Sequence, residues 1–356
     1  MKSIGLLRTL FVGLFAFLAW GAGLAQAQKP VVVHVYSATD SRAFMPLIEA
    51  FEAHRPDIRI EYREFNTSEL YEEVLANWNR ADFEADVVIS SAMDLQVDLV
   101  NQGLALPLDF QAGDFPPEWA RWRGELLGFT YEPVSLVYNK AAFVGRELPS
   151  SHSDLASMIR DDPDFFDGHL GTFDVYFSGV GYLFATQDEI QGQNAARLVE
   201  SLGRARVRLF CCSEEMMDQV ANGTLVLAYN VIGSYALDRA SRDPRIGVHF
   251  MSDYTLVMSR SVFILKKTPV PRAATAFVQF LLSTVGQSLM GTTSSLIPLA
   301  ESARVQDAVR ALTEGIRVAP VPIKLGPGLL VYLDTMKRKA FLGNWGTSIR
   351  PPQSDD

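Results

Sequence analysis

Hydrophobic and polar positions after residue 30 follow, in turn, the periods of strands and of helices. Residues 31–36 form a nearly continuous β-branched run, which is typical of a strand buried on both faces. The next apolar residues recur at the spacing of one helix face: Phe44, Leu47, Ile48 and Phe51. Pro46 lies within this stretch and fits a helix only near its first turn or at a kink.

The same succession of strand and helix repeats before residue 104. Residues 58–62 alternate as a second strand, and Asn66 and Glu69 have the spacing of a capping box that opens the next helix. Residues 86–89 form a third strand without alternation, and the helix after it ends at Gly103. Strands that alternate with helices in this way indicate a parallel sheet and an α/β fold.

Two longer β segments interrupt this alternation. The first covers residues 130–138 and contains Pro133, which cannot donate to a sheet ladder. We therefore expect this point to be exposed or to lie between two sheets, and we interpret the segment as a connector between lobes. The second covers residues 254–265 and is placed to carry the chain back to the first lobe.

A second β-α series lies between these connectors, from residue 171 to about residue 240. It contains predicted strands at residues 207–210 and 225–229, with a helix at residues 213–222 between them. This series predicts a second lobe of the same class.

Two further helices follow the second connector. One is strongly apolar and surrounds Phe277, Phe280 and Leu281. The other runs from about Gly328 to Leu342, and one of its sides is apolar: Leu329, Leu333 and Met336. Residues 351–356 have the composition of a solvated tail.

The first 27 residues have the pattern of a secretory signal. Lys2 and Arg8 are basic, residues 10–24 are almost wholly apolar or small, and Ala25-Gln26-Ala27 matches a cleavage site. The alternative is an uncleaved membrane anchor, but the apolar stretch is short for a span. We expect a cleaved signal peptide over residues 1–27, a mature chain beginning near Gln28, and export to the periplasm.

Composition and charge narrow the class of ligand. Formal net charge is −9 and becomes −11 once Lys2 and Arg8 are removed. An acidic protein is a poor partner for nucleic acid, although a local cleft within it can still be positive. Cys211 and Cys212 are adjacent, and a disulfide between neighbours needs a strained geometry. We therefore expect two partly buried thiols at a strand end.

Small polar residues follow four predicted strands, at the ends where open α/β sheets bind ligands. They are Ser37 with Thr39, Ser90 with Ser91, Ser178 with Gly179, and Asn230 with Ser234. Each could be an ordinary helix N-cap, but four of them divided between two β-α series favour a binding site. Helix N-termini hold anions through unpaired N–H groups.

Aromatic and basic residues near these turns are weaker candidates. Five tyrosines lie near the strand ends and could pack or line a cleft: Tyr36, Tyr131, Tyr182, Tyr229 and Tyr235. Arg42 and Arg260 are candidate partners for an anion, but we expect both to be exposed at the surface.

Motifs of enzymes and cofactor sites are missing from the sequence. There is no G-x-S-x-G elbow, no P-loop and no closely spaced pair of His residues. Gly179 and Gly181 begin like a dinucleotide loop, but Phe184 occupies the third glycine position. We therefore expect no catalytic residues, no cofactor and no metal ligands.

The strands and turns resemble, in the same order, those of type II periplasmic binding proteins of ABC transporters. The similar segments are residues 35–40, 85–91, 177–179 and 228–235. Within that family the resemblance is to the branch of ferric-ion-binding, hexose-phosphate-binding and phosphoglycerate-sensing proteins. It covers essentially the whole predicted mature chain, although each motif is short.

The resemblance implies a two-lobed α/β fold in which each lobe is a mainly parallel sheet flanked by helices. Two β crossovers would join lobe 1 (residues 28–130 and 256–300) to lobe 2 (residues 131–255 and 301–356). The lobes would close on a ligand by a hinge motion. The closed form, a monomer, would then dock on an ABC permease in the inner membrane or, in the regulatory branch, on a sensor kinase.

The resemblance also bears on the ligand. Iron-binding members typically use a His, a Glu and an adjacent Tyr pair. These positions correspond here to Asp40, Ser91, and Val231 with Ile232, and the last two cannot ligate a metal. A small anionic metabolite, phosphorylated or carboxylated, is therefore favoured. Iron binding remains the alternative, with three candidate ligands: Tyr229, Tyr235 and Asp40.

The predicted ligand contacts come from both lobes. From lobe 1 they are Ser37, Thr39, Asp40, Ser90 and Ser91. From lobe 2 they are Ser178, Gly179, Ser213, Asn230 and Ser234, with Tyr182 and Tyr235 as walls of the cleft.

Overall fold

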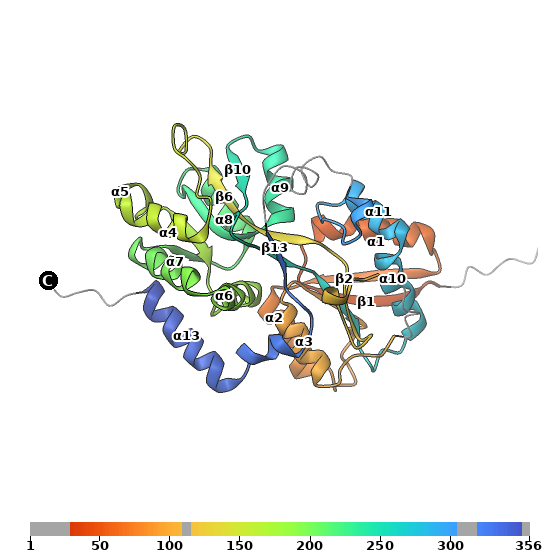
Figure 1. The fold of residues 1–356 in the computed structure, drawn as a ribbon. Coiled ribbons are helices and arrows are strands. Elements are labelled where there is room, and N and C mark those ends of the chain that lie inside the picture. The colour runs from red at the N-terminus through yellow and green to blue at the C-terminus, as the bar shows by residue number, and fades with distance from the viewer. Residues whose placement is uncertain (1–28, 109–114, 305–318, 351–356) are drawn as a thin grey trace, which may run out of the picture.

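The computed structural model describes residues 29–108, 115–304 and 319–350 and contains two separate sheets, each flanked by helices (Figure 1). The predicted signal peptide and the predicted tail at 351–356 lie outside the described residues. The two-lobed α/β architecture predicted from the sequence is confirmed.

The first sheet has the strand order β2-β1-β3-β12-β5-β4. Its strands are β1 (Val31–Ser37), β2 (Ile58–Glu64), β3 (Val87–Ser90), β4 (Arg121–Trp122), β5 (Leu126–Gly128) and β12 (Ser261–Ile264). β1 pairs in parallel with β2 and β3, whereas β12 returns antiparallel to β3. The sheet is therefore mixed, because only its first three strands belong to β-α units.

The second sheet has the order β13-β11-β6-β9-β7-β8, and β10 also pairs with β6. Its strands are β6 (Glu132–Asn139), β7 (Leu170–Phe173), β8 (Arg208–Phe210), β9 (Leu227–Ile232), β10 (Ile246–His249), β11 (Thr255–Met258) and β13 (Pro320–Pro322). β7 is parallel to both β8 and β9, and β6 runs antiparallel to β9 and β11. This sheet is also mixed, because β7, β8 and β9 belong to β-α units and β6 runs against β9.

Helices cover both faces of each sheet. Those around the first sheet are α1 (Ser41–His54), α2 (Thr67–Asn77), α3 (Met93–Asn101), α10 (Pro271–Leu282) and α11 (Thr284–Thr293). Those around the second are α4 (His152–Asp161), α5 (Pro163–Phe166), α6 (Gly179–Gln191), α7 (Gln193–Arg204), α8 (Ser213–Ala221), α9 (Gly233–Arg242) and α13 (Thr335–Ile349). Short 3-10 turns are η1 (Glu118–Ala120), η2 (Glu301–Ala303) and η3 (Pro327–Tyr332).

The central strand β3 is buried on both faces, as its sequence predicts, whereas β2 alternates between buried and exposed residues. Along β3, Val87 and Ile89 pack with α1 and α10, whereas Val88 packs on the opposite side with α2 and α3. This second cluster continues into the other lobe, where it includes Phe184 of α6 and Met216 of α8. The lobes therefore share one apolar cluster beside the point where the chain crosses between them.

Each predicted connector changes sheets within a few residues. The first passes through Phe129 and Thr130 into β6, where Pro133 is buried and lies opposite Val257 of β11 in the second sheet. The second is split into β11 and β12, which belong to different sheets. The backbone N–H of Phe129 donates to the carbonyl of Arg260, so the two crossings lie side by side.

The C-terminal segment differs from the single helix predicted over residues 328–342. The turn η3 ends at Tyr332 and α13 starts at Thr335, with Asp334 capping it. Met336 is 76% exposed, so the predicted apolar side does not extend to it. The segment contacts both lobes, because η3 packs on α3 and α13 packs on α7.

The prediction for the two cysteines is wrong. Cys211 and Cys212 form a disulfide, and both residues are exposed. They follow β8, which is the edge strand of the second sheet, and precede α8. A turn after an edge strand has no sheet neighbour to cover it, so the pair faces solvent.

Candidate functional site

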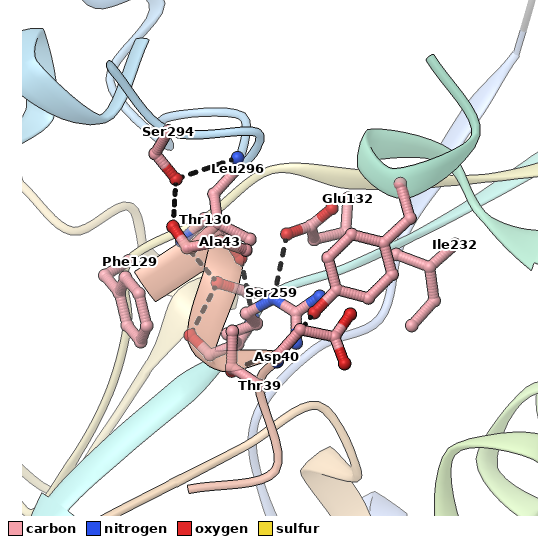
Figure 2. A network of polar contacts seen from close by, with 12 residues as sticks. Thr39, Asp40, Ala43, Phe129, Thr130, Glu132, Ile232, Ser259, Ser294 and Leu296 are labelled. Carbon is pink, nitrogen blue, oxygen red and sulfur yellow. Dashed lines mark hydrogen bonds and ion pairs between the residues drawn. The ribbon is translucent and has the colours of Figure 1, made fainter. Parts of the chain in front are cut away.

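Arg260 lies at the centre of the molecule, where the second crossing meets the first. Its side chain is fully buried, its Nε donates to Glu132 Oε1 at 3.1 Å, and its Nη1 donates to Thr39 Oγ1 at 3.1 Å. Figure 2 shows Thr39, Thr130 and Glu132 arranged around one centre. The guanidinium thus joins the β1–α1 turn of one lobe to the first strand of the other.

The backbone of both crossings holds this arginine in place. The N–H of Arg260 donates to Thr130 Oγ1 at 2.8 Å, and the N–H of Thr130 donates to Ser259 Oγ at 3.3 Å. A Cβ on Gly128 would lie 2.4 Å from Ser259 Oγ, so only glycine allows this close approach. These bonds between the two crossings hold the guanidinium of Arg260 beside Glu132.

The second lobe closes over the guanidinium through α9. The Arg260 Cζ atom lies 4.7 Å from the centroid of the Tyr235 ring, which is a cation–π distance. The Tyr235 hydroxyl accepts from the backbone N–H of Asp40 at 3.2 Å. Tyr235 therefore covers the site from lobe 2 and also contacts lobe 1.

The charges at this centre are stable. Burial alone would lower the pKa of Arg260, but its interactions with Tyr235, Glu132 and Asp40 outweigh burial and hold the pKa above its ordinary value. Burial raises the pKa of Tyr235 well above its ordinary value, so its phenol stays neutral. The site therefore contains the Arg260–Glu132 ion pair and no tyrosinate.

Polar atoms at this centre lack partners. Among the described residues, four buried side-chain atoms have no hydrogen-bond partner, and three of them are Arg260 Nη2, Glu132 Oε2 and Ser234 Oγ. Buried polar groups in native proteins are almost always bonded to protein, water or ligand. These three atoms are therefore free to bond a water molecule or a ligand.

Four of the predicted contacts of the first lobe are buried, Ser37, Thr39, Ser90 and Ser91, whereas Asp40 is partly buried. Ser37 Oγ accepts from the N–H of Thr39 at 3.2 Å, and Ser90 Oγ accepts from the N–H of Ala92 at 3.1 Å. Ser91 is also buried, and Asp40 makes no side-chain cap to α1. The Ser37, Thr39 and Asp40 turn reaches Arg260 and Tyr235, whereas Ser90 reaches β12 through the ladder with Ser261.

In the second lobe, the Ser178–Gly179 turn is occupied by protein. Ser178 Oγ accepts from the N–H of Gly181, and the N–H of Val180 donates to Thr67 Oγ1 in lobe 1 at 3.2 Å. A Cβ on Gly179 would lie 2.8 Å from Leu95 Cδ1. Here the lobes touch directly, and a ligand would have to displace Thr67.

Ser213 and Ser234 occupy the helix starts next to the crossing. Ser213 Oγ accepts from the N–H of Ile232 at 3.3 Å and so links α8 to α9. Ser234 lies in the first turn of α9, which has no side-chain cap, and it is 1% exposed. Of these two hydroxyls, Ser234 is the one without a protein partner.

Two other predicted residues point away from the centre. The Asn230 amide donates to Asp188 Oδ2 at 2.8 Å inside lobe 2, where Tyr229 and Tyr254 donate to the same carboxylate. The Tyr182 hydroxyl donates to the Tyr332 carbonyl, so its ring packs under the C-terminal segment. A strand residue alternates faces, and the left-handed backbone of Asn230 (φ 65°) changes which face its side chain takes.

Sequence reasoning named Arg260 but predicted the wrong exposure for it, and it missed Glu132. Arg42 is exposed as expected, but the prediction that Arg260 is exposed is wrong, and Glu132 was not a candidate at all. The available signal was position: each is a lone charge inside a long β segment that was interpreted as a connector. A charge there is buried if the opposite connector supplies its partner.

The remaining opening between the lobes is small. A cavity of about 20 Å³ is lined from lobe 1 by Asp40 and Arg42 and from lobe 2 by Glu214, Tyr235 and Arg239. The two lobes are in direct contact beside this cavity, through the bond from the Asp40 N–H to the Tyr235 hydroxyl. Within the described residues, no group of three or more His, Cys, Asp or Glu side chains is arranged to hold a metal.

The family assignment follows from comparison with known proteins. The profile described as "Bacterial extracellular solute-binding protein" matches residues 33–292, which include both crossings and Arg260. The chain is a bacterial extracellular solute-binding protein. Solute-binding proteins of ABC transporters bind a small solute outside the cytoplasmic membrane and interact with the permease, so this one belongs in the periplasm.

Solved structures agree with this assignment. The substrate-binding protein of an ABC transporter from Agrobacterium tumefaciens is 31% identical, with a TM-score of 0.83, and the match covers 92% of this chain and 96% of that one. A comparison with curated proteins finds no significant match.

Two more distant structures share the fold. Iron-bound HitA from Pseudomonas aeruginosa is 22% identical, with a TM-score of 0.71 and coverage of 90% and 99%. AfuA from Actinobacillus pleuropneumoniae, with exogenous fructose-6-phosphate bound, is 16% identical, with a TM-score of 0.72 and coverage of 92% and 100%. This solute-binding protein thus has the fold of an iron-bound and of a sugar-phosphate-bound protein.

Proposed function

We propose that this solute-binding protein captures a small anionic metabolite, phosphorylated or carboxylated, between its lobes and delivers it as a monomer to an ABC permease. The observation that carries the proposal is the fully buried Arg260, whose Nη2 has no partner in the described residues. A guanidinium in a water-poor site binds oxyanions through charge-assisted hydrogen bonds. The proposed contacts are Arg260, Thr39 and Ser234.

Two helix N-termini support an anion at this place. Neither α1 nor α9 donates a backbone N–H to the side chain of its N-cap residue, Asp40 or Ile232, although the Ser41 N–H of α1 already donates to Glu64 Oε2 at 2.7 Å. Both helices start beside Arg260, through Thr39 and Tyr235 respectively. Unpaired N–H groups at a helix start favour negative charge, so they add to the attraction of the arginine.

The geometry does not favour the iron alternative. The hydroxyl of Tyr229 donates to Asp188 at 2.7 Å, whereas the hydroxyl of Tyr235 faces the backbone N–H of Asp40. The two candidate tyrosine ligands therefore have separate partners. A tyrosinate charge-transfer colour on addition of ferric iron would revive this alternative.

The hinge proposal follows the lobe boundaries expected from the sequence, after residues 130 and 255. The adjacent crossings at Thr130 and Ser259 support a rotation about this point. Family and fold are those of solute-binding proteins and not of enzymes. We propose that the protein has no catalytic activity, which turnover of a phosphate ester by the purified protein would contradict.

We also propose that residues 1–27 are a cleaved signal peptide. The basic start, apolar stretch and Ala25-Gln26-Ala27 support it. N-terminal sequencing of the protein recovered from periplasmic extract should begin at Gln28, and an intact Lys2 would contradict the cleavage.

A thermal-shift screen tests the ligand class. Sugar phosphates, phosphoglycerates, other carboxylates, inorganic phosphate and ferric citrate are each added to the purified protein. A true ligand at about 100 times its Kd stabilises the folded state by about 2.7 kcal/mol, which raises Tm. A shift with iron alone, and with no organic anion, would overturn the proposal.

A double variant that removes both charges of the ion pair tests where the ligand binds. Arg260→Gln alone leaves Glu132 buried without a counter-charge, so the double variant Arg260→Gln/Glu132→Gln is the better test. We expect it to fold and to lose the ligand-dependent shift. An unchanged shift in a folded double variant would exclude Arg260 from the site.

A further inference from the structure

We infer that the ligand carries a hydrogen-bond donor, a hydroxyl or an ammonium group, beside its anionic group, and that Glu132 accepts from this donor. The inference rests on the proposed function, because it places the ligand between the lobes. It makes Glu132 the residue that selects among anions.

The ion pair between Arg260 and Glu132 contains one hydrogen bond where a bidentate pair would contain two. A structural arginine–carboxylate pair is often bidentate, with two parallel N–H···O bonds. Here a single bond joins Arg260 Nε to Glu132 Oε1 at 3.1 Å, while Nη2 and Oε2 have no partner. Both side chains are 0% exposed, so water from the surface does not satisfy these atoms. One donor and one acceptor are therefore left at the same buried pair.

The unpartnered atoms are concentrated at this place. Three of the four found among the described residues belong to Arg260, Glu132 and Ser234, and the fourth belongs to Asp94 on α3. Ser234 comes close to Glu132 because α9 begins against the crossing: a Cβ on Gly233 would lie 2.2 Å from the Pro133 carbonyl oxygen. The strand, the crossing and the helix thus each contribute one free polar atom.

The chemistry of the three atoms defines a complementary molecule. Arg260 Nη2 can only donate, Glu132 Oε2 as a carboxylate can only accept, and the Ser234 hydroxyl can do both. A ligand that satisfies all of them has an anionic oxygen for the arginine and an O–H or N–H group for the glutamate. A hydroxylated or amino-substituted organic anion meets this requirement.

Electrostatics disfavour a bare oxyanion in the same position. Glu132 offsets the charge of Arg260, so the pair is neutral as a unit. Inorganic phosphate or an alkyl phosphate would meet the guanidinium but leave Oε2 unpaired and facing negative charge, which is costly when buried. The donor on the ligand removes this penalty, and selectivity follows from it.

Matched ligand pairs test the inference by calorimetric titration of the full-length protein. Glycerol 3-phosphate is compared with propyl phosphate, glycerate with propionate, and phosphoethanolamine with ethyl phosphate. The first two pairs differ in two hydroxyl groups, and the third differs in one ammonium group. We expect the donor-bearing member of at least one pair to bind about tenfold or more tightly, because a site built for a donor rejects an analogue without it.

The Glu132→Gln variant identifies the residue responsible. The amide oxygen is expected to stay with Arg260, which has only donors, so the amide N–H₂ faces the ligand and cannot accept. The variant should therefore lose the preference for the donor-bearing member and bind the bare member more tightly than the wild type does. A purely structural role would weaken both members equally and would overturn the inference.

A second variant guards against misfolding of Glu132→Gln. Ser234→Ala removes a hydroxyl without an internal partner, so the ligand-free Tm should not fall, whereas affinity for the donor-bearing member should drop about fivefold or more. The control is Ser135→Ala, which removes a bond to the Val231 carbonyl and should lower Tm without changing the preference.

The outcomes separate the two proposals. Equal binding of both members of every pair would overturn this inference and leave the proposed function intact. Failure of all six compounds to bind the wild-type protein, together with no Tm shift by any organic anion in the thermal-shift screen, would overturn both. A Ser234→Ala variant with wild-type affinity would remove Ser234 from the site and contradict the three-atom arrangement.

Discussion

A single residue, Arg260, organises the region between the lobes. It is the largest fully buried side chain of the described residues that carries a charge, and its partners come from both crossings and from the β1–α1 turn. Removing one member of such a pair leaves the other charge buried and uncompensated, which is strongly destabilising. Binding and stability are therefore linked at this residue.

Asp94 is another buried ionisable residue, and it makes the stability of the protein depend on pH. Burial raises the pKa of Asp94 to about 7. Between the ordinary pKa of an aspartate and this value, the folded protein holds a proton that the unfolded chain does not, so stability falls as pH rises through this window. Above it, the penalty of a buried carboxylate is fully present.

We expect Asp94→Asn to stabilise the protein near pH 8 by on the order of 2 kcal/mol and by much less near pH 5. Urea unfolding at the two pH values measures the difference. Asp161→Asn, at an exposed carboxylate, controls for the loss of one negative charge. Parallel pH profiles of the wild type and Asp94→Asn would contradict the raised pKa of Asp94.

At the scale of elements, helix caps explain most of the local agreement between sequence and structure. The capping box is present, with the Glu69 N–H donating to Asn66 Oδ1 at 2.8 Å. The cap at Ser178 also forms, and for that reason its hydroxyl is already engaged. The break before α13 escaped prediction because the apolar positions Leu329 and Leu333 continue at helical spacing through it.

The cap at Asp334 gives a test of this break. Its Oδ1 accepts from the backbone N–H groups of Met336 and Lys337, each at 3.1 Å. Asp334→Ala should therefore cost about 1 kcal/mol of stability, whereas Asp334→Ser should retain most of it. Thermal unfolding compares the two variants. An equal loss in both would show that the cap does not hold the start of α13.

At the scale of the whole molecule, direct contacts join the two lobes. Besides the contacts of Arg260, they include the bond from the Val180 N–H to Thr67 Oγ1 and the bond from the Asp40 N–H to the Tyr235 hydroxyl. A shared apolar cluster lies between the lobes, and the C-terminal segment contacts both of them, because η3 packs on α3 and α13 packs on α7 (Figure 1). Small changes at these contacts should shift the balance between open and closed forms.

Gly179→Val is expected to open the molecule. A side chain there would meet Leu95 and Thr67 of the opposite lobe, with its Cβ 2.8 Å from Leu95 Cδ1. The radius of gyration from small-angle X-ray scattering should rise above the wild-type value. Gly343→Ala, where the added atom meets open space, is the matched control and should leave it unchanged. Identical scattering of all three proteins would contradict closure at Gly179.

The amino-acid sequence by itself determined the α/β class, the order of strands and helices, the two connectors and the turns at which polar residues gather. These features depend on local periodicity and on capping, which neighbouring residues specify. Tertiary structure alone decided that Arg260 and Glu132 are buried together and that Asn230 and Tyr182 turn away from the centre. A charge separated from its partner by 128 residues looks exposed in sequence, because only the folded backbone brings the two crossings side by side.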